Sequence, residues 1–159
     1  MTPEERLRAR PSFEQATAGY VQMLTEMRAA LARIVPDLRW EHPAPVVNGS
    51  AGCLLPFSDI PGVATVDYGH DSFGRIPEDR WPEALQEITT IAARYHFAAP
   101  QTLSVPAASR PGAIPPRIVY FHDPWGGNFS LQTEVNTILN VQSPCLRHAD
   151  GRDHFIPNG

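Results

Sequence analysis

The sequence predicts a single α+β domain, with two amphipathic helices packed on one face of an antiparallel sheet. Three observations support this class. Two stretches repeat apolar residues at helical spacing, and one long stretch alternates apolar and polar residues as a half-buried strand does. No βαβ alternation repeats along the chain, and no glycine-rich phosphate loop follows a strand, so a doubly wound sheet is not expected.

One domain accounts for the chain, because 159 residues suffice for one sizeable core and no internal repeat is present. We expect this domain to span residues 12–147. Residues 1–11, which carry five charged side chains and two prolines, are expected to form a flexible lead-in. The polar residues 148–159 are expected to form a flexible tail.

The first helix is predicted to begin after Ser12 and to end before Pro36, which cannot continue a helix. Ser12 and Gln15 have the spacing of a capping box. Apolar residues then recur every three or four positions and define one helical face: Phe13, Ala16, Tyr20, Leu24, Met27, Leu31 and Ile34.

The second helix is predicted to begin after Asp79, as its N-cap, and to end near Phe97. Pro82 falls in its first turn, where a missing N–H costs least. Its apolar face consists of Trp81, Leu85, Ile88, Ala92 and Tyr95.

Residues 128–142 are predicted to form one long strand, with a bulge or bend near Asn136 or Asn140. Their odd-numbered positions are apolar or β-branched, and their even-numbered positions are polar apart from Ile138. Because successive side chains of a strand point to opposite faces, one parity is expected in the core and the other toward water or another layer.

The other strands are shorter. Residues 117–122 are rich in β-formers and precede a turn at 123–127, so they are expected to form a hairpin with the long strand. Further strands are predicted at residues 38–42, 62–68 and 102–105, and proline-rich or glycine-rich loops at residues 43–61, 69–77 and 106–116.

The charge pattern argues against nucleic acid as a partner. The formal net charge is −4, and the 13 basic residues, all arginine, form no basic stripe. No window approaches the about 20 apolar residues of a membrane-spanning helix, and the polar opening residues lack the pattern of a signal peptide. The protein is therefore expected either to be cytosolic or to have lost an export signal.

Two His-Asp pairs lie at the ends of predicted strands: His70, Asp71, His122 and Asp123. Functional residues often occupy such positions, so one alternative is a hydrolase-like enzyme that uses all four. Turn chemistry explains both aspartates equally well. If His70 and His122 share one pocket, the enzyme becomes the better reading.

Trp125 lies at the hairpin turn, beside two glycines, and is either an exposed recognition aromatic or a ring packed back on the sheet. With His70 and His122 it forms the candidate binding surface. No metal site and no cofactor are expected, because the histidines show no i, i+4 pair on a predicted helix. His148 and His154 lie in the polar tail, where solvation explains them.

Cys53 and Cys145 are the only cysteines. From the residues alone, a disulfide, two reduced thiols and a nucleophilic cysteine with a histidine partner remain open. No flanking pattern supports the nucleophile.

Several short elements occur in the order typical of a known family: Ser12-Phe13, Ile34-Val35-Pro36, Trp40, Ala51-Gly52-Cys53, Glu78-Asp79, Ala93-Arg94-Tyr95 and a final strand that leads to Cys145. Over residues 12–146 the chain resembles the actinobacterial, mycobacterial-type lipoproteins of the LppA/LppV family. Two positions depart from the family pattern, because His96 and Pro144 stand where the family has glycine.

The resemblance implies that Cys53 and Cys145 form a disulfide. It also implies an N-terminal lipid, added after removal of a signal peptide, that holds the protein at the extracytoplasmic face of the cell membrane. We therefore expect the extracytoplasmic domain of a membrane-anchored lipoprotein with a non-enzymatic role in binding or in the envelope. Its partner would be an envelope protein or a small ligand, and a purely structural role without a ligand is a further alternative.

Overall fold

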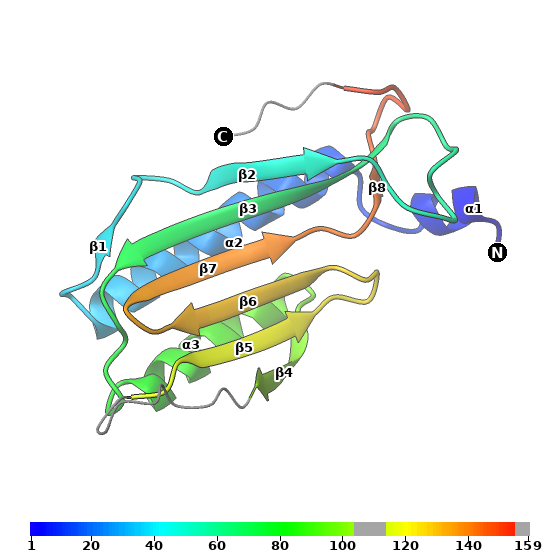
Figure 1. Ribbon diagram of the computed structural model, residues 1–159. Coiled ribbons are helices and arrows are strands. Elements are labelled where there is room, and N and C mark those ends of the chain that lie inside the picture. The colour runs from blue at the N-terminus through cyan, green and yellow to red at the C-terminus, as the bar shows by residue number, and fades with distance from the viewer. Residues whose placement is uncertain (104–113, 155–159) are drawn as a thin grey trace.

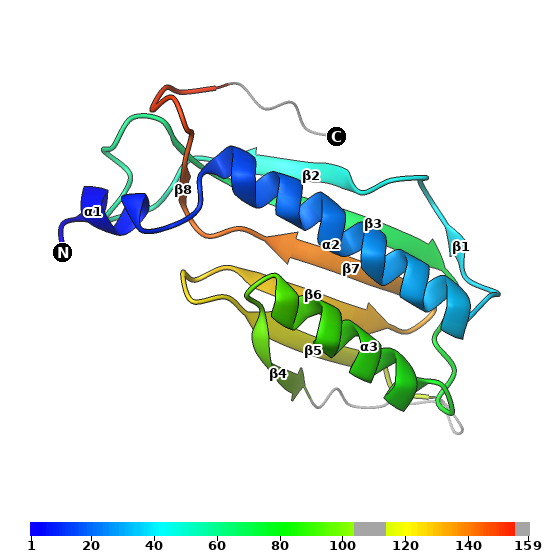
Figure 2. The same cartoon turned by 180° about the vertical axis from the view of Figure 1, so that it is seen from behind.

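The computed structural model describes residues 1–103 and 114–154 and confirms the α+β class. Helices α2 (Phe13–Ile34) and α3 (Trp81–Arg94) lie on one face of an antiparallel sheet, and no helix of the described residues covers the other face (Figure 1, Figure 2). A short helix α1 (Pro3–Arg8) precedes them. The strands are β1 (Arg39–Trp40), β2 (Val46–Ala51), β3 (Val63–Phe73), β4 (Ala98–Leu103), β5 (Arg117–His122), β6 (Asn128–Thr133), β7 (Asn136–Gln142) and β8 (Leu146–Arg147).

The strand order is β1-β3-β7-β6-β5-β4, and all neighbouring strands are antiparallel. β2 shares one edge of β3 with β1, whereas β8 pairs with Val63 and Ala64 of β3, beyond the end of β7. The core lies between the sheet and the helices. Its largest fully buried side chains include Phe121, Phe129, Leu131 and Leu139 from the sheet and Met23, Leu24, Met27, Leu31 and Ile88 from the helices.

α2 follows the sequence prediction closely. The Ser12 hydroxyl accepts the N–H of Gln15 at 3.1 Å, and the Gln15 side chain accepts the N–H of Ser12 at 3.0 Å, so the predicted capping box is present. All seven residues of the predicted apolar face are buried. The local sequence of α2 therefore determines both where the helix begins and which of its faces is buried.

α3 forms where expected, but its ends differ from the prediction. Arg80 precedes the helix and makes no side-chain cap, so the prediction of Asp79 as N-cap is wrong. Pro82 lies in the first turn as predicted, and the helix ends at Arg94 rather than near Phe97. Among the described residues, no helix is both long and apolar enough to cross a membrane.

The predicted long strand is in fact two strands, β6 and β7, joined by a tight turn at Glu134 and Val135. The prediction of one bulged strand over residues 128–142 is therefore wrong. Thr133 pairs with Thr137, and because both paired positions are odd, odd-numbered side chains stay on one face through the turn. The alternation continues while the chain reverses. Val135 at the tip departs from it, with 77% of its surface exposed, and the even-numbered Ser130 departs from it by being buried.

The region predicted as a loop over residues 43–61 contains β2, and β3 extends five residues past its predicted end at residue 68. The Asn48-Gly49-Ser50 segment has turn composition, yet it pairs with β3, with a register shift between Val47 and Gly49. β3 is longer because residues 67–73 pair with β7, a partner far away in sequence. Long-range pairing thus overrides local composition at both places.

β4 begins earlier than predicted, and both ends of the described chain make contacts with the domain. β4 begins at Ala98 rather than at residue 102, and residues 104 and 105 of the predicted strand lie outside the described part of the chain. The expected lead-in contains α1, whose Leu7 is only 2% exposed. In the expected tail, Nδ1 of His148 lies 3.1 Å from Oε2 of Glu14. The flexibility of these ends stays a prediction.

Candidate functional site

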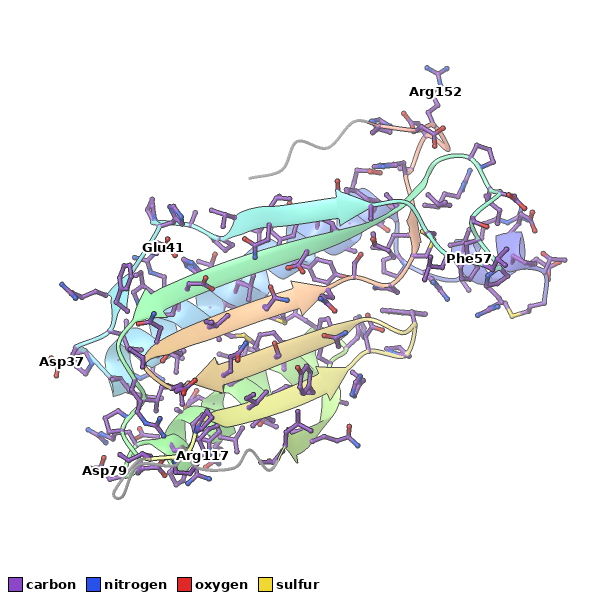
Figure 3. All side chains as sticks on the ribbon, viewed as in Figure 1. Asp37, Glu41, Phe57, Asp79, Arg117 and Arg152 are labelled. Carbon is purple, nitrogen blue, oxygen red and sulfur yellow. A yellow bond between two sulfur atoms is a disulfide. The ribbon has the colours of Figure 1, made fainter. Side chains whose placement is uncertain are left out.

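The candidate site is the open face of the sheet, which we define as the face away from α2 and α3. Figure 3 views the molecule from this side, with the helices behind the strands. The residues of this face alternate along each strand with residues that point to the helices. They include Asp67, Asp71 and Phe73 of β3, Ile138, Asn140 and Gln142 of β7, Asn128, Gln132 and the buried Ser130 of β6, and Ile118, Tyr120 and His122 of β5.

The part of the open face formed by β5, β6 and β7 carries little charge, whereas β3 contributes Asp67 and Asp71. In the described strands β5, β6 and β7 it presents amides, hydroxyls, isoleucines and His122, but no carboxylate and no arginine. Arg117 of β5 lies on the opposite face, with its guanidinium carbon 5.9 Å from the ring centre of Trp81. Soluble protein surfaces ordinarily have about a quarter to a third charged residues. This part of the face therefore differs from one that only has to remain soluble.

Asp67 is the centre of a hydrogen-bonded group on this face, the Asp67 network, formed by Asp67, Asn128, Asn140 and Gln142. With its amide nitrogen toward β3, Asn140 donates to Oδ1 of Asp67 at 2.7 Å and to the Tyr68 carbonyl at 3.3 Å. Gln142 donates to Oδ2 of Asp67 at 3.4 Å, and Asn128 donates to Gln142 at 3.3 Å. Side chains from three strands are thus held in fixed orientations.

A hollow of about 310 Å³ lies beside the Asp67 network. Its lining includes Asp67 and Gln142 of the network, together with Thr65, Ala51 and Ser143. The Ser143 hydroxyl accepts the N–H of Val66 at 2.9 Å, which fixes the chain at the end of β7. The hollow joins a concave surface to an array of oriented donors and acceptors, the combination that ligand sites use.

His70 does not belong to a binding surface, and its predicted place there is wrong. It lies on the helix-covered face of β3, is 1% exposed, and has its ring centre 4.9 Å from that of Trp40. Neither ring nitrogen has a hydrogen-bond partner. Burial, with smaller contributions from the charges of Arg28 and His42, lowers the pKa of His70 to about 4, so the ring is neutral at neutral pH.

The four residues of the predicted hydrolase do not meet. His122 is exposed on the open face at the end of β5, and Asp71 lies on the same face of β3, but β6 and β7 separate the two strands. His70 points to the other face. Burial, followed by the charge of Glu41, raises the pKa of Asp71. The geometry gives no shared pocket for His70 and His122.

Trp125 is half-buried and packs against another ring. It meets His96 edge-on, with ring centres 5.4 Å apart. Asp123, two residues earlier, accepts the N–H groups of Trp125 at 2.8 Å and Gly127 at 2.7 Å through Oδ1. The turn chemistry expected of this aspartate is therefore present.

Cys53 and Cys145 form a disulfide, with Cα atoms 5.6 Å apart, and the described residues include no free cysteine. The bond joins the segment after β2 to the segment between β7 and β8. Arg10 donates to the Cys145 carbonyl at 2.8 Å, which ties the N-terminal segment to the same place.

Within the described residues, no group of three or more histidine, cysteine, aspartate or glutamate side chains is arranged to hold a metal ion. His148 and His154 instead stack, with ring centres 4.2 Å apart, and His154 lies 3.0 Å from the Asp150 carboxylate. These contacts account for the histidines of the tail.

Sequence reasoning placed the even-numbered residues of the long alternation toward water or another layer and expected binding through the proline-rich loops and the exposed sheet face, but it missed the Asp67 network. One signal was present. The even-numbered residues of β6 and β7 are amides, a serine and an isoleucine, where a face that serves only solubility would carry charges. The pairing of Asp67 with Gln142 across β3 and β7, which completes the network, has no local signal.

These features define a class of protein: a helix-backed antiparallel sheet whose second face is exposed and polar. Residues 2–148 match the model of the LppA family, described as a lipoprotein confined to pathogenic Mycobacterium, and the chain belongs to this family. No curated protein matches the chain significantly.

Two solved structures share the fold. The crystal structure of LppA from Mycobacterium tuberculosis has 16% sequence identity and a TM-score of 0.67, and the match covers 96% of this chain and 86% of that one. A DUF4853 family protein from Actinomyces odontolyticus has 15% identity and a TM-score of 0.57, with 93% and 78% covered. At these identities the likeness establishes the fold alone.

Proposed function

We propose that this chain is the extracytoplasmic, non-enzymatic binding domain of a membrane-anchored lipoprotein, and that its open face binds a neutral, hydroxyl-rich ligand, an oligosaccharide. The Asp67 network on an otherwise weakly charged sheet face is the observation that carries the choice of ligand. A structural envelope protein without a ligand would need no such array.

Membrane attachment is supported by the lipoprotein family to which the chain belongs. A lipid on a segment that precedes residue 1 would hold the domain at the cell membrane. The Cys53–Cys145 disulfide suits this location, because disulfides persist in oxidising compartments outside the cytoplasm. Fractionation of cells that express the full gene should place the protein in the membrane, and recovery in the cytosol would contradict the attachment.

The chemistry of the open face favours a sugar over a charged ligand. An amide offers donors and acceptors together, and a sugar hydroxyl is also both, so each amide can exchange hydrogen bonds with vicinal hydroxyls. Asn128, Asn140 and Gln142 are already oriented by the network, so little side-chain freedom is lost on binding. The Tyr120 ring shares this face and can cover the apolar side of a sugar ring.

Binding of a panel of neutral gluco-, manno- and galacto-oligosaccharides, measured by calorimetry, tests the proposal. Asp67→Asn replaces the acceptor of two amide donors and should weaken binding at least about tenfold, the effect of losing one to two hydrogen bonds. Gln142→Ala should do the same, whereas Gln22→Ala on the exposed side of α2 is the matched control. Absence of binding across the panel, or equal binding by all variants, would contradict the proposal.

A further inference from the structure

A second, more enclosed cavity lies on the helix side of the molecule. Its volume is about 160 Å³, and it opens between the start of α2, the end of α3 and the turn between β5 and β6. In Figure 2 these three segments meet at one end of the sheet. Ala16 and Gly19 line it from α2, and their small side chains leave the space open.

One wall of the cavity is a buried carboxylate. Asp123 is 9% exposed, and its Oδ1 is held by the N–H groups of Trp125 and Gly127. Oδ2 has no hydrogen-bond donor among the described residues, and a Cβ on Gly127 would come within 2.5 Å of it. The turn therefore presents a carboxylate oxygen that has no hydrogen-bond donor among the described residues.

The other walls are aromatic. Tyr20, Tyr95, His96, Phe97 and Trp125 all line the cavity. Tyr20 and Phe97 lie 6.2 Å apart and His96 and Trp125 lie 5.4 Å apart, measured between ring centres. Burial and the nearby Asp123 charge raise the pKa of Tyr20, so its hydroxyl stays neutral and adds no second negative charge.

His96 is held in an unfavourable backbone conformation. Its φ is +72°, in the left-handed region that glycine prefers. Among the described residues, no other non-glycine residue has a positive φ. This position follows Tyr95, the C-cap of α3, and the N–H of Phe97 donates to the carbonyl of Ala92 at 3.0 Å, a helix ending that glycine usually provides. A side chain kept at such a position points to a use for its ring, which here closes the cavity against Trp125.

We propose that this cavity binds a small organic ammonium group, with Asp123 as its counter-ion and the rings of Trp125, His96 and Tyr20 around it. Aromatic faces attract cations, and a carboxylate among them adds direct charge pairing. The inference is independent of the sugar proposed for the open face.

No cation of the described residues already fills this role. Arg10 lies close enough to Asp123 for the two charges to interact. The Arg10 guanidinium, however, donates to the Cys145 carbonyl and lies 4.8 Å from the ring centre of Phe57. No ion pair joins Arg10 to Asp123 within the described part of the chain. Arginine and lysine are likewise missing from the described lining of the cavity.

Titration with choline, followed by NMR at the Trp125 indole, tests the proposal on the whole chain. The uncharged isostere 3,3-dimethylbutanol has the same shape without the cation, and should bind at least about tenfold more weakly. His96→Gly removes the ring and relieves the backbone strain, so it should weaken choline binding by a similar factor without lowering the melting temperature. His42→Ala, at an exposed histidine outside the cavity, is the control and should bind choline as the wild type does.

Asp123→Asn keeps an acceptor for the two turn N–H groups but removes the charge, and should weaken choline binding much more than binding of the isostere. Should this variant fail to fold, the comparison of choline with its isostere on the wild type and on His96→Gly decides the matter. Equal affinity for choline and the isostere, unchanged choline binding by His96→Gly, or no binding of choline would each overturn the proposal.

Discussion

The hydroxyl oxygens of Thr133 and Thr137 lie 2.9 Å apart on the buried face of the turn between β6 and β7. Thr137 donates to the Gly74 carbonyl at 2.9 Å, so its oxygen is the acceptor for Thr133, which itself accepts the N–H of Ile76 at 2.9 Å. This chain of hydrogen bonds fastens the turn to the segment that leads from β3 into α3.

Thr137→Val should therefore destabilise the domain by about 1–3 kcal/mol, because it leaves buried polar groups without partners while preserving side-chain shape. Urea denaturation measures the change. Thr90→Val, at an exposed threonine of α3, is the matched control and should change stability by less than about 0.5 kcal/mol. Equal effects from the two variants would show that the buried chain of hydroxyls contributes nothing.

Neighbouring residues of β6 test the assignment of its two faces. Leu131 is fully buried, so Leu131→Asp should unfold or severely destabilise the domain by placing a charge in the core. Gln132 lies on the open face, and Gln132→Asp should leave the fold intact. Circular dichroism and thermal melting of both variants provide the readout, and similar melting temperatures would refute the assignment.

His70 should make stability depend on pH. Its folded pKa of about 4 lies below the ordinary value of 6.5, so the unfolded chain binds a proton that the folded chain does not between these two values. The free energy of unfolding should thus fall as the pH drops from about 6.5 to 4. His70→Leu removes the titrating group. The free energy of unfolding of the wild type should therefore fall relative to that of the variant as the pH drops through this window. If the difference in unfolding free energy between the wild type and His70→Leu did not change with pH, the burial of a neutral ring would be contradicted.

The disulfide should contribute substantially to stability. Cys53 and Cys145 are 92 residues apart, and closing a loop of this length constrains the unfolded chain by about 4–5 kcal/mol on the chain-entropy model. Thiol labelling of the native protein should find no free cysteine, and reduction should lower the melting temperature. An unchanged melting temperature after verified reduction would be inconsistent with this contribution.

Much of the fold could be predicted because it depends on local signals. α2 has its capping box at Ser12 and its apolar stripe within one continuous segment. The turn residues between β5 and β6 predict the hairpin that these strands form. The turn between β6 and β7 was hidden because Thr133 and Thr137 share parity, so a reversal left the alternation unchanged. The β2 strand was hidden by residues that favour turns and form a strand only against β3.

The candidate site was less predictable than the fold. His70 was placed at a strand end, yet pairing with Leu139 of β7 continues the strand and buries the ring beneath a helix. Asp67 and Gln142 are 75 residues apart and meet only because β3 and β7 pair. Trp125 was recognised by its turn, but its partner His96 comes from the end of α3.

Side-chain amide NMR, recorded during titration with the neutral oligosaccharide that binds most tightly, tests the function of the open face most directly. The NH₂ signals of Asn128, Asn140 and Gln142 should shift together, because they belong to one network, while those of Gln22 and Gln86 on the helices should not. Shifts confined to the helix side, or no shifts in the Asp67 network, would contradict binding at the open face.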